Sequence, residues 1–132
     1  MEEKEFDVIF SDQVLKELFP EIRANQFFEA LYGDIQEGAY DIGLKFKNFD
    51  PQNNQFHFDL ELKERPGKCL ACNLTYGLPQ VFARHPVINV KGIVQEIEKI
   101  LGSGLNCQTW SLGRTDPVSS KLHVIPLTIQ LS

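Results

Sequence analysis

The stretch that decides the fold runs Tyr40-Asp-Ile-Gly-Leu-Lys-Phe-Lys47 and continues, after a short polar segment, as Phe56-His-Phe-Asp-Leu-Glu-Leu-Lys63. In both parts apolar and polar residues alternate one by one, which is the pattern of a β-strand with one buried and one solvent-facing side. The segment between them, residues 50–54, is Asp-Pro-Gln-Asn-Asn and is typical of a turn. We therefore predict an antiparallel hairpin.

The charges on the polar sides predict the register of this hairpin. Opposite charges meet when Lys45 lies across from Asp59 and Asp41 lies across from Lys63. A shift of two residues would place Asp41 across from Glu61, which are like charges. We therefore predict the first register. On the apolar side it pairs Phe46 with Phe58 and Leu44 with Leu60.

Two helices are predicted before the hairpin, over residues 14–19 and 20–32. Ser11 or Asp12 is suited to cap the first helix, and Pro20 is tolerated at the first position of the second. Gly33 is a typical helix end. The second helix carries an apolar stripe that needs a sheet to cover, made of Ala24, Phe27, Phe28 and Leu31.

Further elements are predicted before the two helices and after the hairpin. Phe6, Val8 and Phe10 alternate with other residues and suggest a short strand, preceded by a flexible acidic tail over residues 1–5. After the turn at Pro66-Gly67 a third strand is predicted over residues 68–78, with a bulge near Cys69. Its core-facing residues would be Leu70, Cys72, Leu74, Tyr76 and Leu78.

The last third of the chain predicts one helix and two strands. Residues 78–86 are expected to be irregular, Asn89 to cap a helix that ends at Gly102, and strands to follow over 105–112 and 122–131. The apolar residues of that helix fall on one face: Val90, Ile93, Val94, Ile97 and Leu101. In the final strand the alternation changes phase across Ile125-Pro126, which predicts a bulge or an edge strand.

The predicted fold is therefore a single α+β domain over residues 1–132, with a mainly antiparallel sheet of about five strands and two main helices on one face. The order is helix, three strands, helix, two strands. Double-stranded RNA-binding domains and secretion-type chaperones have similar orders, but the chain shows no residue motif of either. The helix after Asn89 lacks the lysine cluster of an RNA-binding domain.

Composition narrows the function classes. The 132 residues are 42% hydrophobic and 23% charged, and 18 acidic residues against 13 Lys and Arg give a net charge of −5. A negative net charge repels nucleic acids and anionic membranes, so neither is an expected partner. There is no signal-peptide pattern and no apolar run long enough to span a membrane. The three cysteines are too few for a disulfide framework, so we predict free thiols and a cytoplasmic location.

The cysteine pair Cys69-Leu-Ala-Cys72 is the most conspicuous short motif. Metal binding or redox cycling would need both sulfurs on one side, whereas a spacing of three in a strand puts them on opposite faces. We therefore expect no metal and no cofactor, with Cys72 as a small core residue. No catalytic machinery is evident, because His57 and His123 are predicted to face outward and lack partners for a triad. Asp59 and Glu61 have the spacing of solvent-facing strand residues.

A small anionic ligand is the alternative to a protein partner. Arg84 and His85 precede the helix capped by Asn89, whose exposed amides favour anions. Trp110 and Arg114 are candidates for the wall and the mouth of the same pocket. The competing interpretation is that these residues form a solvated loop and a packed aromatic side chain. Enzyme activity would require Arg84, His85 and Arg114 to converge.

The preferred hypothesis is a chaperone-like binding or adaptor domain. The outer face of the predicted third strand carries Ala71, Asn73 and Thr75, which are small and uncharged and suit close approach by another chain. Association through the sheet, with itself as a homodimer or with a polypeptide partner, is therefore the predicted function.

Overall fold

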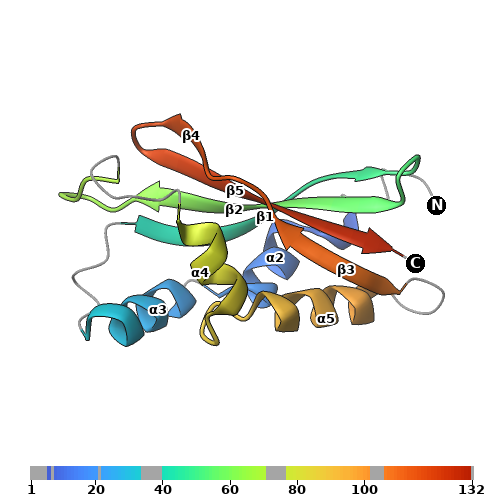
Figure 1. Cartoon of the computed structure of the whole chain (residues 1–132), viewed down its shortest axis with the longest axis horizontal. Coiled ribbons are helices and arrows are strands. Elements are labelled where there is room, and N and C mark those ends of the chain that lie inside the picture. Colours follow the sequence, from blue (N-terminus) through green and yellow to red (C-terminus); the bar gives the residue numbers. More distant parts are fainter. Residues whose placement is uncertain are drawn as a thin grey trace.

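The computed structural model describes residues 6, 8–20, 22–33, 40–70, 77–101 and 106–131. The fold is α+β with a five-stranded antiparallel sheet, and the order helices, strands, helices, strands confirms the predicted class. The helices lie together on one side of the sheet (Figure 1). The elements are α2 (Asp12–Leu18), α3 (Ile22–Tyr32), β1 (Tyr40–Asp50), β2 (Gln55–Glu64), α4 (Leu78–Arg84), α5 (Val90–Leu101), β3 (Cys107–Leu112), β4 (Asp116–Ser119) and β5 (Leu122–Leu131).

The hairpin of β1 and β2 has the predicted register. Lys45 lies across from Asp59 and Asp41 across from Lys63, while Phe46 pairs with Phe58. The ladder shifts only after Phe46, close to the turn. The turn follows its predicted chemistry, because the carboxylate of Asp50 accepts hydrogen bonds from the backbone of residues 52 and 53.

The charges that indicate this register do not pair with one another. Lys45 forms its ion pair with Asp12 of α2 at 3.6 Å, and Asp41 pairs with Arg65 at 2.9 Å. Like charges facing each other would still disfavour the shifted register. The cross-strand positions are thus correct, while the salt bridges tie β1 to α2 and to the end of β2.

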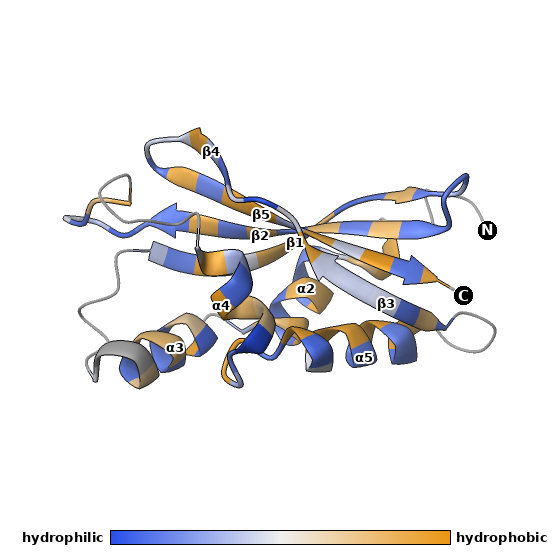
Figure 2. Ribbon diagram, in the orientation of Figure 1, coloured by the Kyte–Doolittle hydropathy of each residue, from blue (hydrophilic) through white to orange (hydrophobic). Residues whose placement is uncertain are grey.

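The final strand β5 is central, so the predicted edge is wrong, and no bulge interrupts its ladder with β2, although on its other side the pairing breaks between β3 and β4. It lies between β2 and the β3–β4 segment, and its pairing with β2 runs from Lys63–Leu122 to Gln55–Gln130 without a shift. His123 is on the helix-covered side and is buried, contrary to its predicted outward position. Alternating hydrophobic and hydrophilic bands along β2 and β5 mark the two sides of the sheet (Figure 2).

The predicted first strand is helical. Phe6, Val8 and Ile9 have helical conformation, and the amide of Phe10 donates to the carbonyl of Phe6 at 2.8 Å. Residues four apart share one side of a helix. Phe6 and Phe10 are accordingly buried against the sheet, whereas Val8 is 77% exposed.

The prediction for residues 68–86 is also corrected. Residues 71–76 lie outside the described residues, but at the ends of the predicted third strand Lys68–Leu70 are not in a strand and Leu78 begins α4. A bulge near Cys69 is therefore wrong, and so is the irregular segment after Leu78. Pro79 lies in the first turn of α4, where its missing N–H costs no helical hydrogen bond.

The three helices α2, α3 and α5 follow the predicted signals. Ser11 caps α2 by accepting from the amide of Val14, and Gly33 follows α3 with a positive φ of 78°. The side-chain oxygen of Asn89 accepts from the amide of Gly92 and caps α5. The apolar faces of α3 and α5 are buried on the sheet, including Phe27 and Ile97.

Candidate binding groove at the edge of the sheet

Strand β1 forms one edge of the sheet. The strand order is β1-β2-β5-β3, so β1 pairs with β2 and with no other strand of the described ranges. An edge strand presents unpaired backbone N–H and C=O groups that can bind another strand. At the centre of this edge Gly43 has no atom within 4 Å of the place where a Cβ would stand.

A groove of about 270 Å³ runs along this edge, and we call it the edge groove. One wall is formed by Leu15 and Lys16 of α2 and by Phe19, which directly follows that helix, and the floor by residues 41–45 of β1. Leu15 and Phe19 are nearly buried and continue the core to the groove. The edge groove therefore combines the apolar wall of Leu15 and Phe19 with the free backbone groups of β1. Peptide-binding grooves that add a strand have the same combination.

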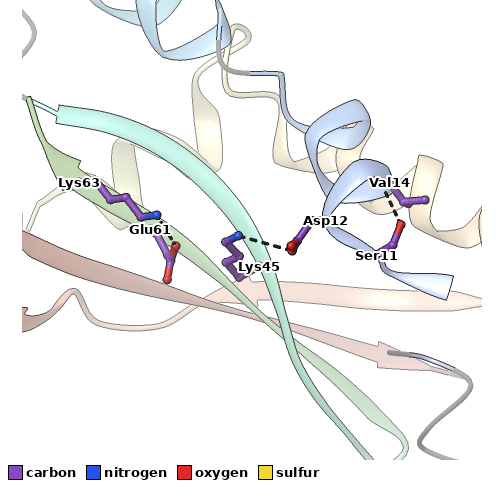
Figure 3. Close-up of polar contacts among 6 residues, drawn as sticks. All are labelled: Ser11, Asp12, Val14, Lys45, Glu61 and Lys63. Atoms are coloured by element: carbon purple, nitrogen blue, oxygen red, sulfur yellow. Dashed lines mark hydrogen bonds and ion pairs between the residues drawn. The ribbon is translucent and has the colours of Figure 1, made fainter. Parts of the chain in front are cut away.

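Charged side chains of both signs surround the edge groove. Lys45 reaches from β1 toward Asp12 of α2, and Glu61 faces Lys63 on β2 (Figure 3). The side chains of Lys45 and Asp12 are 43% and 83% exposed, so this ion pair is weakly stabilising. An incoming chain can replace it at little cost.

Arg65, which lies outside the lining of the groove, holds the lining residue Asp41 in place. Its Nε donates to Asp41 at 2.9 Å and a terminal nitrogen donates to Asn25 at 2.6 Å. The guanidinium also lies over the ring of Phe28, 5.2 Å from the centroid. Only one carboxylate oxygen of Asp41 is used in the Arg65 contact, and Asp41 stays 66% exposed. The carboxylate of Asp41 is therefore accessible to a further donor.

The residues predicted to bind an anion are divided between two places. Arg84 ends α4 and His85 follows it, so both lie in the connection that leads to Asn89. The Nδ1 atom of His85 accepts from the amide of Val87, and its ring packs on Phe27 with centroids 4.9 Å apart. His85 thus stabilises the loop, while Arg84 is exposed at the carboxyl end of a helix, which does not attract anions.

The remaining two predicted ligands come from the end of β3. Trp110 lies on the helix-facing side of β3 and packs partly buried against the core. Arg114 is exposed in the link between β3 and β4. Within the described part of the chain no hydrogen bond or ion pair joins Arg114 to Arg84 or His85. The structure therefore supports the packing role for Trp110.

A second hollow lies at the start of α5. It measures about 320 Å³ and includes Arg23, Asn89, Gly92 and Glu96 in its lining. Burial lowers the pKa of Arg23, which contacts the carbonyl of Ile88 and the ring of Phe19. Asn89 is occupied by its capping bond, and the carboxylate of Glu96 opposes an anion. This hollow thus lacks the uniform positive charge of an anion site.

The cysteines differ from their prediction. Cys69 takes part in a disulfide, so the expectation of three free thiols is wrong. Cys72, Ala71, Asn73 and Thr75 lie outside the described residues, and their predicted roles stay predictions. Cys107 is a free thiol, and burial, with a smaller effect of Glu98, raises its pKa to about 11.

Asp59 and His57 of β2 lie on the uncovered face of the sheet. Burial raises the pKa of Asp59, while the charge of Lys47 opposes this rise. His57 contacts the hydroxyl of Thr128 at 3.4 Å on the same face. No group of three or more potential metal ligands is found in the described ranges.

Comparison with known proteins gives no relative. No protein-family model matches the chain, and neither a curated protein nor a solved structure matches it. No helix of the described residues is long and apolar enough to cross a membrane.

The edge groove is missing from the sequence-based site predictions. Its parts come from residues 12–19 and 41–45, which are far apart in the chain, and from the position of β1 at the end of the strand order. The only sequence signal for the groove is the mixture of charges on β1 and β2, which by itself predicts the register of the hairpin and not a binding site.

Proposed function

We propose that this chain is a binding domain that holds an extended polypeptide as an added strand at the free edge of β1. The observation that carries the proposal is the edge groove, where the unpaired side of residues 41–45 lies beside α2. Strand addition obtains its affinity from main-chain hydrogen bonds and its specificity from alternate side chains. An enzyme function is not part of the proposal.

The chemistry of the groove favours a polypeptide over a nucleic acid. Its lining has acidic residues (Asp12, Asp41, Glu61) and basic residues (Lys16, Lys45, Lys63) in equal number. The chain as a whole carries a net charge of −5. Such a surface repels phosphate backbones but suits a strand with charges of both signs.

A small anionic ligand is less well supported. The predicted site needs Arg84, His85 and Arg114 to converge, yet His85 is held in loop contacts and Arg114 belongs to the β3–β4 link. A cytoplasmic location remains part of the proposal because the cysteines are few, although the Cys69 disulfide is more typical of an oxidising compartment. Counting free thiols in protein purified from its host under alkylating conditions tests it, and a complete Cys69 disulfide there would argue for an oxidising compartment.

The experiment selects binders from a displayed library of random 12-residue peptides and maps the best peptide by amide hydrogen exchange. We expect slower exchange at residues 41–45 when the peptide is bound, because strand addition protects edge amides. Amides of β5 serve as an internal reference, since both sides of that strand are already paired.

A crosslink across the groove provides the matched control. Asp12→Cys and Lys45→Cys are combined in a Cys107→Ser background and joined with dibromobimane, which ties α2 to β1 where the native ion pair stands. We expect peptide affinity to fall at least tenfold in the crosslinked protein and not in the two alkylated single-cysteine variants. Selected peptides that bind the crosslinked protein equally well would contradict the proposed site.

A further inference from the structure

The edge of β1 is symmetric in its charges and in its apolar residues. Asp41 and Lys45 lie two residues before and after Gly43, on the side of the sheet that the helices leave uncovered. On the opposite side Ile42 and Leu44 flank the same glycine. A strand of this kind is complementary to an antiparallel copy of itself.

We infer that the polypeptide held at the edge groove is a second copy of this chain, whose β1 pairs with β1 in antiparallel orientation about Gly43. This inference rests on the proposed function and names its partner. Asp41 of each copy then lies across from Lys45 of the other, so two opposite-charge pairs form by symmetry. The two sheets become one continuous sheet.

Other registers of the same pairing are less favourable. A shift by one residue places the apolar side of one copy against the uncovered side of the other. Centring the pair on Asp41 or on Lys45 brings identical charges face to face, which is destabilising. A centre at Leu44 would also pair Asp41 with Lys47 of the other copy, but it leaves each Lys45 across from Gly43, whereas the centre at Gly43 pairs both Asp41 and Lys45 and has open space at its middle.

The contacts within one chain prepare this edge for its copy. Arg65 donates to Oδ1 of Asp41, and the side chain of Asp41 stays 66% exposed, so a lysine of the second copy can reach it. Lys45 is bound to Asp12 at 3.6 Å by an exposed pair, which it can exchange for Asp41 of the second copy. Leu15 and Phe19 in the wall of the edge groove lie on the side that the second copy's Ile42 and Leu44 would face.

Charge-swap variants test the inference by analytical ultracentrifugation. We expect the unmodified protein to sediment as a dimer, and Asp41→Lys or Lys45→Asp alone to weaken the dimer at least tenfold by facing like charges. An equimolar mixture of these two variants should form a heterodimer, because every cross-strand pair is again of opposite sign. Circular dichroism of each variant checks that it is folded.

A cysteine crosslink tests the centre without altering charge. With Gly43→Cys in a Cys107→Ser background, the two cysteines would lie directly across from each other, where cross-strand Cβ atoms come closest, at about 4.5 Å, the upper end of the disulfide range, so mild oxidation should produce a covalent dimer. Lys47→Cys, on the same strand but away from the centre, should not crosslink.

Three outcomes contradict the inference in different ways. A monomer at 100 μM that still binds selected peptides with protection at residues 41–45 overturns the second copy and leaves the proposed function standing. A monomer with no peptide protection at β1 overturns both. A dimer that survives both single charge changes and gives no Gly43→Cys crosslink overturns this interface.

Discussion

The ring of Pro126 in β5 fills the space beside Gly113 where a side chain would otherwise stand. A Cβ at Gly113 would lie 2.7 Å from Cγ of Pro126, and the amide of Gly113 donates to the carbonyl of Pro126 at 2.8 Å. The N–H and C=O of a strand residue face the same neighbouring strand. The nitrogen of Pro126, which carries no hydrogen, therefore faces the link between β3 and β4, as its carbonyl does. Proline is thus tolerated in a central strand because the ladder is interrupted at that place.

We predict that Gly113→Ala lowers the free energy of unfolding by about 1–3 kcal/mol, because the added methyl group overlaps the proline ring. Urea denaturation measures the change. Gly43→Ala is the control, since its Cβ would meet no atom within 4 Å, and it should change stability little. In the Gly113→Ala background, Pro126→Ala should recover part of the loss. Strictly additive effects of the two changes would contradict the contact.

Arg65 is predicted to stabilise the monomer more than a surface charge usually does. Its side chain is 16% exposed and binds Asp41, Asn25 and the ring of Phe28, so Arg65→Ala should cost about 1–3 kcal/mol. Arg65→Lys should recover only part, because one ammonium group cannot make the forked contacts. Lys63→Ala, which removes a 62% exposed side chain, should cost under about 0.5 kcal/mol. Equal losses for Arg65 and Lys63 would contradict the difference in their environments.

The thiol of Cys107 is predicted to be unreactive in the folded protein. Its raised pKa of about 11 keeps it protonated at pH 8, whereas an unfolded thiol has a pKa near 8.5. Alkylation by iodoacetamide should therefore be about a hundredfold slower in the folded protein than in urea. Glu98→Gln should accelerate the reaction only modestly, because burial is the larger cause. Similar rates in folded and unfolded protein would show that Cys107 is accessible as thiolate.

Local patterns predicted the elements whose signals are strong within a few residues. The alternation around Leu44 and Leu60 and the capping residue Asn89 placed a hairpin and a helix correctly. Phe6, Val8 and Phe10 gave a wrong prediction because a spacing of two indicates a strand, while Phe6 and Phe10 are also four apart, as residues on one side of a helix are. The structure is helical and buries both phenylalanines.

Long-range geometry could not be predicted in the same way. Pro126 indicated an edge strand, and only the interruption beside Gly113 explains its central position. The edge groove depends on α2 lying beside β1, which no pattern within either segment specifies. Whether the predicted anion ligands meet depends in the same way on long-range packing, because Arg84 ends α4 whereas Arg114 lies in the link between β3 and β4.

The carboxylate of Asp59 is predicted to make stability depend on pH in the acid range. Its pKa is raised in the folded protein, chiefly by burial, so the folded state holds this proton more tightly than the unfolded state does. As pH rises from about 4 through the folded pKa, this group therefore lowers the free energy of unfolding, and the full cost applies above that range. Asp59→Asn, which stays neutral, should raise the melting temperature at pH 7 and lose this advantage near pH 3.5.

Lys47→Gln provides the opposite change at the same carboxylate. The charge of Lys47 favours the ionised form of Asp59, so its removal should raise the pKa of Asp59 further and lower the melting temperature at pH 7. The effect of Lys47→Gln should largely vanish in the Asp59→Asn background, because the carboxylate that it stabilises is then absent. If Asp59→Asn changed the melting temperature equally at pH 7 and pH 3.5, the cause would lie in packing and not in the ionisation of this carboxylate.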